Sequence, residues 1–234
     1  MSSPKSDHAI ALVKKMIATG RLKPGDRLPN EDEFSAQLGI SRNSMREAVR
    51  ALQAMQVLVA RQGDGTYVSS LEPSDMIKSL NFAVDVAGPA AVVNFLDVRK
   101  LIEVHAAEIA AIHRSESDLR KLVAIHESVL RLEDPEVLIE LDSEFHQTIA
   151  AVTNNPVLSA LLRVVSGPTM RARIWRFRHA DQNFGALRRE HGVILDAIQL
   201  RDVDAARYAM WSHVSGVQKW VEANPESLKA MERD

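Results

Sequence analysis

Between residues 74 and 223 the apolar residues recur at helical spacing, and no stretch alternates in the way a half-buried strand does. We expect helices over residues 74–86, 90–113, 116–132, 135–152, 156–177, 184–200 and 203–223. Pro135 and Pro156 fall in first turns, where a missing N–H is tolerated, and Asp134 and Asn155 are suitable caps before them. Six or seven helices of this length pack as a bundle. The sequence therefore predicts an all-α C-terminal part.

The first 70 residues follow a different pattern, with short helical stretches and then a Gly-rich segment. We expect helices over 8–19, over 31–38 and from 42 onward, and strands over 57–60 and 66–69 around a glycine-rich turn. Asn30 and Ser41 are suitable caps for the second and third helices, and Gly39 ends the second. Two short helices joined by a Gly turn are typical of a helix-turn-helix, and the hairpin after them would form a wing.

One face of the third helix is apolar, and the opposite face carries Arg42, Asn43, Arg46 and Arg50. Each arginine taken alone is explained by a solvated helix surface. The combination with a capped helix, a Gly turn and a hairpin favours duplex DNA instead, because Arg and Asn bind guanine, adenine and phosphate oxygens.

The charge distribution indicates that the N-terminal and C-terminal parts of the chain have different partners. The chain has 234 residues with a net charge of −2, but residues 1–70 carry a net charge of +3 and residues 71–234 a net charge of −5. Cys is absent, so thiolate metal ligands and disulfides are excluded. We find no apolar leader near the N-terminus and no uninterrupted run of 18 apolar residues, so we expect a soluble, cytoplasmic protein that does not enter membranes.

The N-terminal motifs resemble the winged helix-turn-helix of GntR-family bacterial transcription regulators. The resemblance is carried by Gly20-x-Leu22-x-Pro24-Gly25-x-Arg27-Leu28-Pro29, then Ser41-Arg42-x3-Arg46-Glu47-Ala48, then Gly63-x-Gly65-x-Tyr67-Val68. It implies that the DNA-binding residues are those of the third helix and of the wing tip, namely Arg42, Asn43, Arg46, Arg50, Gly63 and Gly65.

Three positions depart from the pattern of that family. Asp32 stands where an Arg is usual, Asp64 stands at a wing tip that is often basic, and Gln56 stands where a Gly commonly ends the recognition helix. Both aspartates would repel phosphate, so we expect a lower non-specific DNA affinity than is usual in the family.

In the C-terminal part, one carboxylate and three histidines have the character of metal ligands. Asp142 and His146 lie one turn apart on one helix face, beside apolar neighbours, and an unpaired buried Asp there would be costly. His191 and His213 each lie on their own amphipathic helix. Joint coordination would give an N₃O site for Zn²⁺, Ni²⁺ or a similar ion. The spacing alone supports metal binding only by Asp142 and His146. For His191 and His213, a histidine packed in the core remains the alternative.

These residues also resemble the FCD effector domain of the FadR-type branch of GntR regulators. The resemblance covers Asp142-x3-His146, Asn155-Pro156, Glu190-His191-x2-Ile194-x2-Ala197-Ile198 and Ala205-Ala206-x6-His213. It implies that Asp142, His146, His191 and His213 hold a divalent cation, most simply Zn²⁺, and it disfavours a fatty-acyl effector.

Two arginines are candidates for binding an effector at that cation. Arg99 lies in Asp97-Val98-Arg99-x3-Glu103, which matches the position of an arginine that reaches the cavity of the FCD domain. The alternative is an exposed i,i+4 ion pair with Glu103. Arg173 belongs to a basic and aromatic run over residues 171–178, most of which we expect to be solvated. A guanidinium near the cation would complement a carboxylate.

We therefore expect a winged helix-turn-helix domain over residues 1–72 and an FCD-like effector-binding and dimerisation domain over residues 73–234. The predicted function is a homodimeric repressor that binds a palindromic operator in double-stranded DNA and responds to a small organic or sugar acid bound at the metal. Two alternatives remain open: a metal-dependent hydrolase, and a regulator whose metal is purely structural. We expect no catalytic residues, because neither a general base beside the four ligands nor a nucleophile motif is evident.

Overall fold

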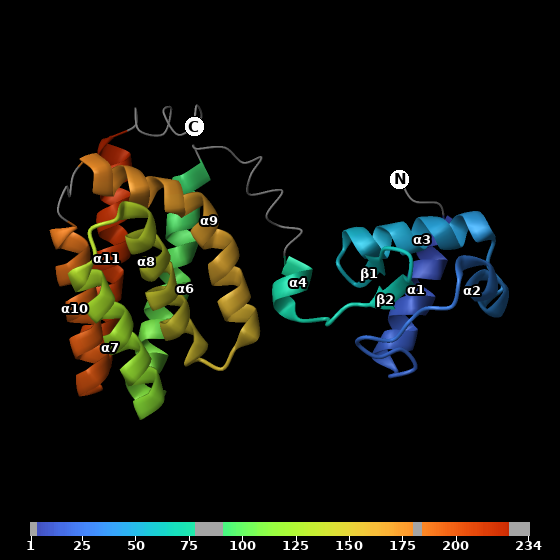
Figure 1. Ribbon diagram of the computed structural model, residues 1–234, viewed down its shortest axis with the longest axis horizontal. Coiled ribbons are helices and arrows are strands. Elements are labelled where there is room, and N and C mark those ends of the chain that lie inside the picture. The colour runs from blue at the N-terminus through green and yellow to red at the C-terminus, as the bar shows by residue number, and fades with distance from the viewer. Residues whose placement is uncertain (1–3, 78–90, 180–183, 225–234) are drawn as a thin grey trace. The chain divides into compact units, whose positions relative to one another are not determined.

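The computed structural model describes residues 4–77, 91–179 and 184–224. The chain divides into two compact units, residues 1–79 and 80–234 (Figure 1), whereas the sequence predicts a boundary after residue 72. The described residues form ten helices and one two-stranded antiparallel sheet. This confirms the predicted mainly helical fold class with a small hairpin in the N-terminal part.

The first unit opens with three helices, α1 (Pro4–Ala18), α2 (Glu31–Leu38) and α3 (Arg42–Ala54). Asn30 accepts a hydrogen bond from the Glu33 amide at 2.9 Å, and Ser41 accepts one from the Ser44 amide at 3.2 Å, so both predicted caps are confirmed. The inward faces of the helices meet the hairpin in a common apolar core. The fully buried members of that core include Val13, Phe34, Met45, Leu52 and Leu58.

Among the residues of this unit that have a left-handed backbone, one ends α2 and another follows α3. Gly39 ends α2 with φ 67°, which a residue without a Cβ adopts at little cost. Gln56, after the end of α3, has φ 58° although it is not glycine. The unusual residue noted in the sequence at the end of the recognition helix therefore lies at a position whose conformation favours glycine.

The hairpin consists of β1 (Leu58–Arg61) and β2 (Gly65–Val68), paired antiparallel with Leu58 opposite Val68. The preceding loop extends the sheet, because the Leu28 amide donates to the Thr66 carbonyl at 2.8 Å and the Val68 amide donates to the Asp26 carbonyl at 2.9 Å. The hairpin is thereby attached to the segment that leads into α2. A short helix, α4 (Pro73–Ile77), follows.

The second unit is a bundle of long helices. They are α6 (Val92–His113), α7 (Glu116–Arg131), α8 (Pro135–Ala151), α9 (Pro156–His179), α10 (Gly185–Leu200) and α11 (Val203–Ala223). The expected helix over 74–86 is described only as far as residue 77, and the rest of it lies outside the described residues. Asp134 caps α8 through the Glu136 amide at 2.9 Å, and Asn155 accepts from the Val157 amide at 3.1 Å. These predicted caps are confirmed.

Helices from every part of the bundle contribute to one apolar core. α6 and α11 pack along each other, and α8, α9 and α10 close around them (Figure 1). Leu96, Phe145, Leu162, Ile194 and Met210 are fully buried there. This packing fixes α8, α10 and α11, the three helices that carry the predicted metal ligands.

Two arginines join the C-terminal ends of α6 and α10 reciprocally. Arg114, which follows α6, donates to the Gln199 carbonyl of α10 at 2.9 Å. Arg201, which follows α10, donates to the Ile112 carbonyl of α6 at 2.8 Å and to the Arg114 carbonyl at 3.0 Å. Both contacts satisfy carbonyls that a helix end leaves unpaired. The two helix ends are thereby held at a fixed distance.

Among the helices that the structure describes, none combines the length and the apolar character needed to cross a membrane.

Candidate metal centre and nucleic-acid interface

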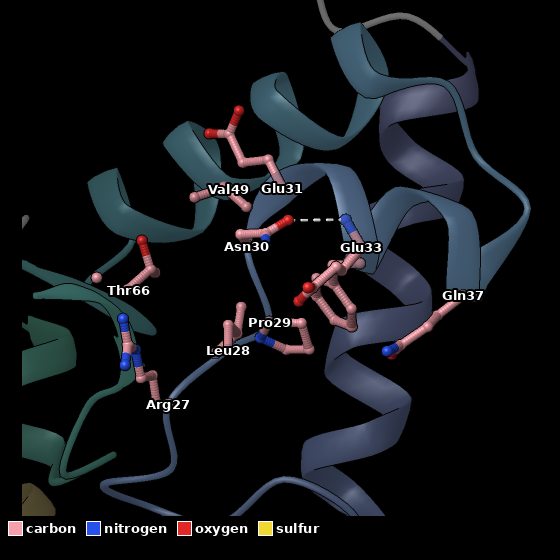
Figure 2. A pocket seen from close by; sticks show the side chains of 11 residues that line it. Arg27, Leu28, Pro29, Asn30, Glu31, Glu33, Gln37, Val49 and Thr66 are labelled. Carbon is pink, nitrogen blue, oxygen red and sulfur yellow. Dashed lines mark hydrogen bonds between the residues drawn. The ribbon is translucent and has the colours of Figure 1, made fainter.

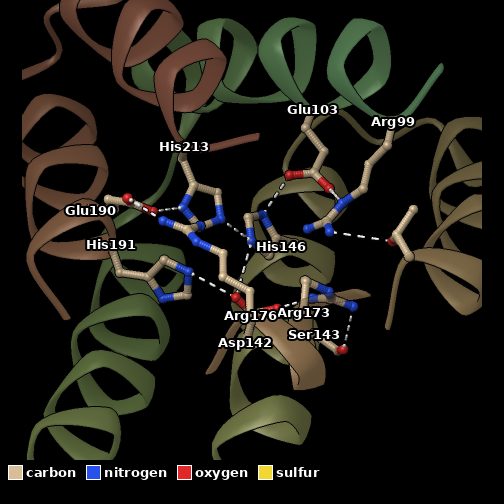
Figure 3. A network of polar contacts seen from close by, with 11 residues as sticks. Arg99, Glu103, Asp142, Ser143, His146, Arg173, Arg176, Glu190, His191 and His213 are labelled. Atoms are coloured by element: carbon tan, nitrogen blue, oxygen red, sulfur yellow. Dashed lines mark hydrogen bonds and ion pairs between the residues drawn. The ribbon is translucent and has the colours of Figure 1, made fainter. Parts of the chain in front are cut away.

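The four predicted ligands come together inside the second unit. α8 supplies Asp142 and His146, α10 supplies His191 and α11 supplies His213, and their side chains point toward one another (Figure 3). All four residues are buried, with 0 to 3% of their surface exposed. One ligand atom from each lies within 4.8 Å of the others. The structure therefore unites residues that are up to 71 positions apart in the sequence.

The distances between these donor atoms suit a shared cation. Nε2 of His146 and Nε2 of His213 are 3.2 Å apart, and Asp142 Oδ1 lies 3.1 Å from His191 Nε2 and 3.5 Å from His146 Nε2. Two donors of a tetrahedral ion, each about 2.1 Å from it, lie about 3.4 Å apart, which is close to these separations. The donor set of three imidazoles and one carboxylate is one that Zn²⁺ and neighbouring divalent metals accept.

Two further carboxylates bond the outward nitrogens of these rings. Glu103 Oε2 lies 2.6 Å from Nδ1 of His146, and Glu190 Oε2 lies 2.7 Å from Nδ1 of His213. Nδ1 of His213 donates its hydrogen to Glu190, which leaves Nε2 of that ring as a lone pair, and the Glu103 carboxylate beside Nδ1 of His146 favours the same tautomer there. The two Nε2 atoms face each other and lie beside the Asp142 carboxylate, so a cation between them would satisfy all three groups. The cluster can therefore bind a metal.

Burial lowers the pKa of all three imidazoles and so favours the neutral form that a metal requires. It lowers the pKa of His191 well below the usual value, and the neighbouring charges of His213 and His146 lower it further. Burial also lowers the pKa of His213 to about 4, against the opposing effect of its bond to Glu190. A neutral imidazole has a free lone pair for coordination.

Both predicted effector-binding arginines lie beside the cluster and are 1% exposed. Arg99 pairs with Glu103 and lies 3.4 Å from the Thr169 hydroxyl, so the i,i+4 pair considered in the sequence does form, but inside the bundle. Arg173 pairs with Asp142 and lies 3.5 Å from the Ser143 hydroxyl. Arg173 is therefore buried, and Arg176, the other arginine of the run whose side chain the structure describes, is only 13% exposed.

Sequence reasoning did not assign the two carboxylates that bond the histidines. Glu103 entered only as a partner of Arg99, and Glu190 only as a neighbour of His191 in a motif. Glu190 in fact bonds His213, 23 residues away, and pairs with Arg176 at 3.1 Å. Burial alone would raise the pKa values of both glutamates. The neighbouring histidines and arginines have the larger combined effect, so both pKa values are lowered. In the sequence, Glu190 is adjacent to His191. This adjacency indicates a glutamate near the cluster, but it does not indicate that Glu190 bonds His213.

The predicted DNA-binding residues of α3, which are Arg42, Asn43, Arg46 and Arg50, are all exposed. Two of them contact acidic residues of α2: Arg42 Nε lies 3.1 Å from Asp32 Oδ1, and Arg46 Nε lies 3.0 Å from Glu31 Oε2. Asp32, which the sequence indicated as unusual, is therefore an intramolecular partner of the recognition helix.

The wing tip has a constrained backbone and an ordered polar network. Gly63 and Gly65 have φ of 74° and 140°, and a Cβ at Gly65 would lie 3.0 Å from Nε of Arg27. The Tyr67 hydroxyl donates to Asp64 at 2.7 Å, while the Arg61 guanidinium lies 4.0 Å from the centre of the Tyr67 ring. Asp64 is thereby held against the hairpin by a neutral hydroxyl.

A recess of about 680 Å³ lies between the start of α2 and the hairpin (Figure 2). Arg27, Glu31, Glu33 and Thr66 are among the residues that line it. Its mixture of one guanidinium and two carboxylates does not favour an anion as strongly as the arginine face of α3 does. The candidate metal-binding cluster is in the other unit.

Comparison with known proteins follows the same division. The model for bacterial regulatory proteins of the gntR family matches residues 5–68, and that for the FCD domain matches residues 94–216. The chain is 32% identical to the HTH-type transcriptional regulator LutR of Bacillus subtilis over 209 residues. This alignment covers 87% of this chain and 94% of LutR. The chain belongs to the GntR family of bacterial transcription regulators.

Other GntR proteins support this assignment at lower identity. The galactonate operon transcriptional repressor of Escherichia coli is 29% identical over 214 residues, with 89% of this chain and 93% of that protein covered. A solved structure of GntR from Streptococcus agalactiae is 26% identical and superposes with a TM-score of 0.62 over 92% of this chain and 99% of that chain. The family is one of transcription regulators, not of enzymes, so the hydrolase alternative is not retained.

Proposed function

We propose that this GntR regulator is a homodimeric repressor whose binding to a palindromic operator is controlled by a small organic or sugar acid at a divalent metal. Residues 1–72 bind DNA, and residues 73–234 bind the effector and dimerise. The observation that carries the proposal is the buried meeting of Asp142, His146, His191 and His213, with two bare imidazole nitrogens 3.2 Å apart. A cation between them would satisfy both nitrogens and the Asp142 carboxylate.

The metal in this proposal is Zn²⁺, with Ni²⁺ or a similar ion as the next candidate. Three neutral imidazoles and one carboxylate satisfy the ligand preference of these ions. Four protein ligands also leave positions open on a five- or six-coordinate ion, and a carboxylate or hydroxyl of an effector can fill them. The metal supplies this point of attachment when it is bound.

The arginines beside the cluster provide the second half of the effector site. Nη2 of Arg99 and Nε of Arg173 are buried and make no hydrogen bond to the described residues. A buried guanidinium N–H without an acceptor is costly, and a carboxylate oxygen is its preferred partner. We therefore place the effector carboxylate against Arg99 and Arg173. A related protein that represses a galactonate operon supports both the acid class and the sign of regulation.

In the DNA-binding part, the proposal assigns base and phosphate contacts to α3 and backbone contacts to the wing. The α3 residues are Arg42, Asn43, Arg46 and Arg50, and the wing residues are Gly63 and Gly65. Two copies are needed because a single short recognition helix reads few base pairs, and two helices related by a two-fold axis read an inverted repeat. The effector then favours one arrangement of the dimer over the other.

A structural role for the metal is the second candidate, and the ion pair of Arg173 with Asp142 favours it. A ligand carboxylate that is already paired inside a closed core resembles a purely structural site. The two candidates agree on metal binding and differ on whether an acid alters DNA binding.

One experiment separates them. The full chain loaded with Zn²⁺ selects its preferred duplex from a randomised pool, and the affinity for that duplex is then measured with and without a panel of hydroxy acids that includes galactonate. The proposal expects an inverted repeat and release of DNA by at least one acid, with no release from the chelated protein. Metal binding without any response across the panel favours the structural role, and absence of bound metal contradicts both candidates.

A further inference from the structure

The three histidines of the cluster are held in two different ways. His191 stacks on the Phe145 ring, with centroids 4.2 Å apart and planes 14° from parallel, and its Nδ1 has no hydrogen-bond partner among the described residues. Nδ1 of His213 is instead held by a hydrogen bond to Glu190 at 2.7 Å, and Nδ1 of His146 lies in an ion-pair contact with Glu103 at 2.6 Å. Figure 3 shows Glu103 and Glu190 on the far sides of these two rings from the cluster.

We propose that Glu190 is a positioning residue of the metal centre, which holds His213 in the tautomer and orientation that direct Nε2 to the cation, and that Glu103 does the same for His146. This inference rests on the proposed metal-dependent function. Neither glutamate contacts the ion. Each acts through the histidine that it bonds.

The physical reason is the coupling between the two ring nitrogens. A hydrogen bond from Nδ1–H to a carboxylate fixes the proton on that nitrogen, prevents the ring from flipping and makes the opposite nitrogen a stronger donor to a metal. Glu190 is suited to this because it lies on α10 and bonds a ring on α11, while Arg176 of α9 holds its other oxygen at 3.1 Å. The carboxylate is thus fixed from a third helix.

Charge supports the same assignment. A divalent ion adds two positive charges to a region where Asp142 and Glu103 are each paired with a buried arginine. Glu190, which is paired with Arg176, keeps a negative charge next to a ligand ring, and its loss would leave Arg176 as one more positive charge near the cation. Loss of this charge therefore weakens metal binding even if the substituted side chain still accepts the hydrogen bond.

Glu190 is also the glutamate that can be replaced without disrupting the core. Its side chain is 29% exposed, whereas that of Glu103 is 1% exposed and its removal would leave Arg99 as an unpaired buried charge. The test variant is therefore Glu190→Gln. A matched control is Glu108→Gln, because Glu108 lies 3.8 Å from Nδ1 of the exposed His105, outside the cluster.

The experiment measures the affinity of the full chain for Zn²⁺ by competition with a chromophoric chelator, and repeats the titration with Co²⁺ to follow its absorption bands. We expect Glu190→Gln to bind about 10- to 100-fold more weakly than the wild type, with altered Co²⁺ bands. We expect Glu108→Gln to bind as the wild type does. Melting of the metal-free proteins reports separately on folding, and the three are expected to melt alike.

Affinities of Glu190→Gln and Glu108→Gln that agree within twofold, with a wild type that binds Zn²⁺, overturn the positioning role and leave the proposed function intact. An equal loss of stability with and without metal identifies Glu190 as a packing residue and also overturns it. A wild type that binds neither Zn²⁺ nor Co²⁺ removes the proposed metal centre itself, which distinguishes that failure from the failure of this inference.

Discussion

Arg42 of the recognition helix α3 contacts Asp32 of α2, with 3.1 Å between Nε and Oδ1, although both side chains are more than half exposed. An ion pair this exposed adds little to stability. We expect its effect to fall on DNA binding, because the carboxylate would compete with phosphate for the arginine. Glu31 is placed in the same way beside Arg46. The protein thus holds two of the arginines predicted to bind DNA in contact with its own acidic residues.

Replacing this carboxylate is expected to strengthen DNA binding. Asp32→Asn removes a negative charge beside the phosphate-facing arginines, so affinity for any duplex should rise about 3- to 10-fold at low salt, with a smaller gain at high salt. Fluorescence anisotropy over a series of salt concentrations measures it. The matched control is Asp204→Asn, which breaks an exposed Asp–Arg pair on α11. An unchanged affinity for Asp32→Asn would show that the pair does not compete with phosphate.

The opposite change on the same face is expected to weaken DNA binding. Arg46→Ala removes an exposed guanidinium from α3, and the loss should be about 1–3 kcal/mol of binding free energy, with a shallower salt dependence if the contact is to phosphate. Metal content should not change. Arg207→Ala, which removes an exposed arginine from α11, is the control. Equal affinities for the two variants would contradict the assignment of α3 as the recognition helix.

Metal removal is expected to lower thermal stability. Chelation of the loaded protein removes binding free energy that adds to folding, about 2.7 kcal/mol when free metal is at 100 times its dissociation constant. Differential scanning calorimetry with and without a chelator measures the shift in Tm. His146→Ala should lack bound metal, so the chelator should not change its Tm further. His105→Ala, an exposed histidine of α6, should behave as the wild type.

The wing is expected to tolerate a methyl group at one glycine better than at another. Gly65→Ala combines a φ of 140° with a Cβ 3.0 Å from Nε of Arg27, and we expect a loss of about 1–3 kcal/mol in local stability. Gly63→Ala has a φ of 74° and open space, so its cost should be about 1 kcal/mol. Hydrogen exchange of the amides in residues 58–68 measures both. Similar protection in the two variants would show that the approach of Arg27 is unimportant.

Local features of the fold could be predicted because their causes lie within a few residues. Asn30 and Ser41 cap helices through amides three residues ahead, and Asp134 does so through amides two and three residues ahead. Helical geometry alone also places Asp142 and His146 on one face. The prediction that these two act together needed no knowledge of the rest of the chain.

The sequence by itself therefore determined the helices, the hairpin, and a carboxylate and an imidazole one turn apart on α8. Only the tertiary structure decided that His191 and His213 complete the cluster, that Glu190 holds His213, and that Arg173 is buried against Asp142. The reason is that capping and helical spacing depend on backbone bonds between near neighbours. The meeting of α8, α10 and α11 depends instead on how apolar faces of separate helices pack, which no short stretch of sequence specifies.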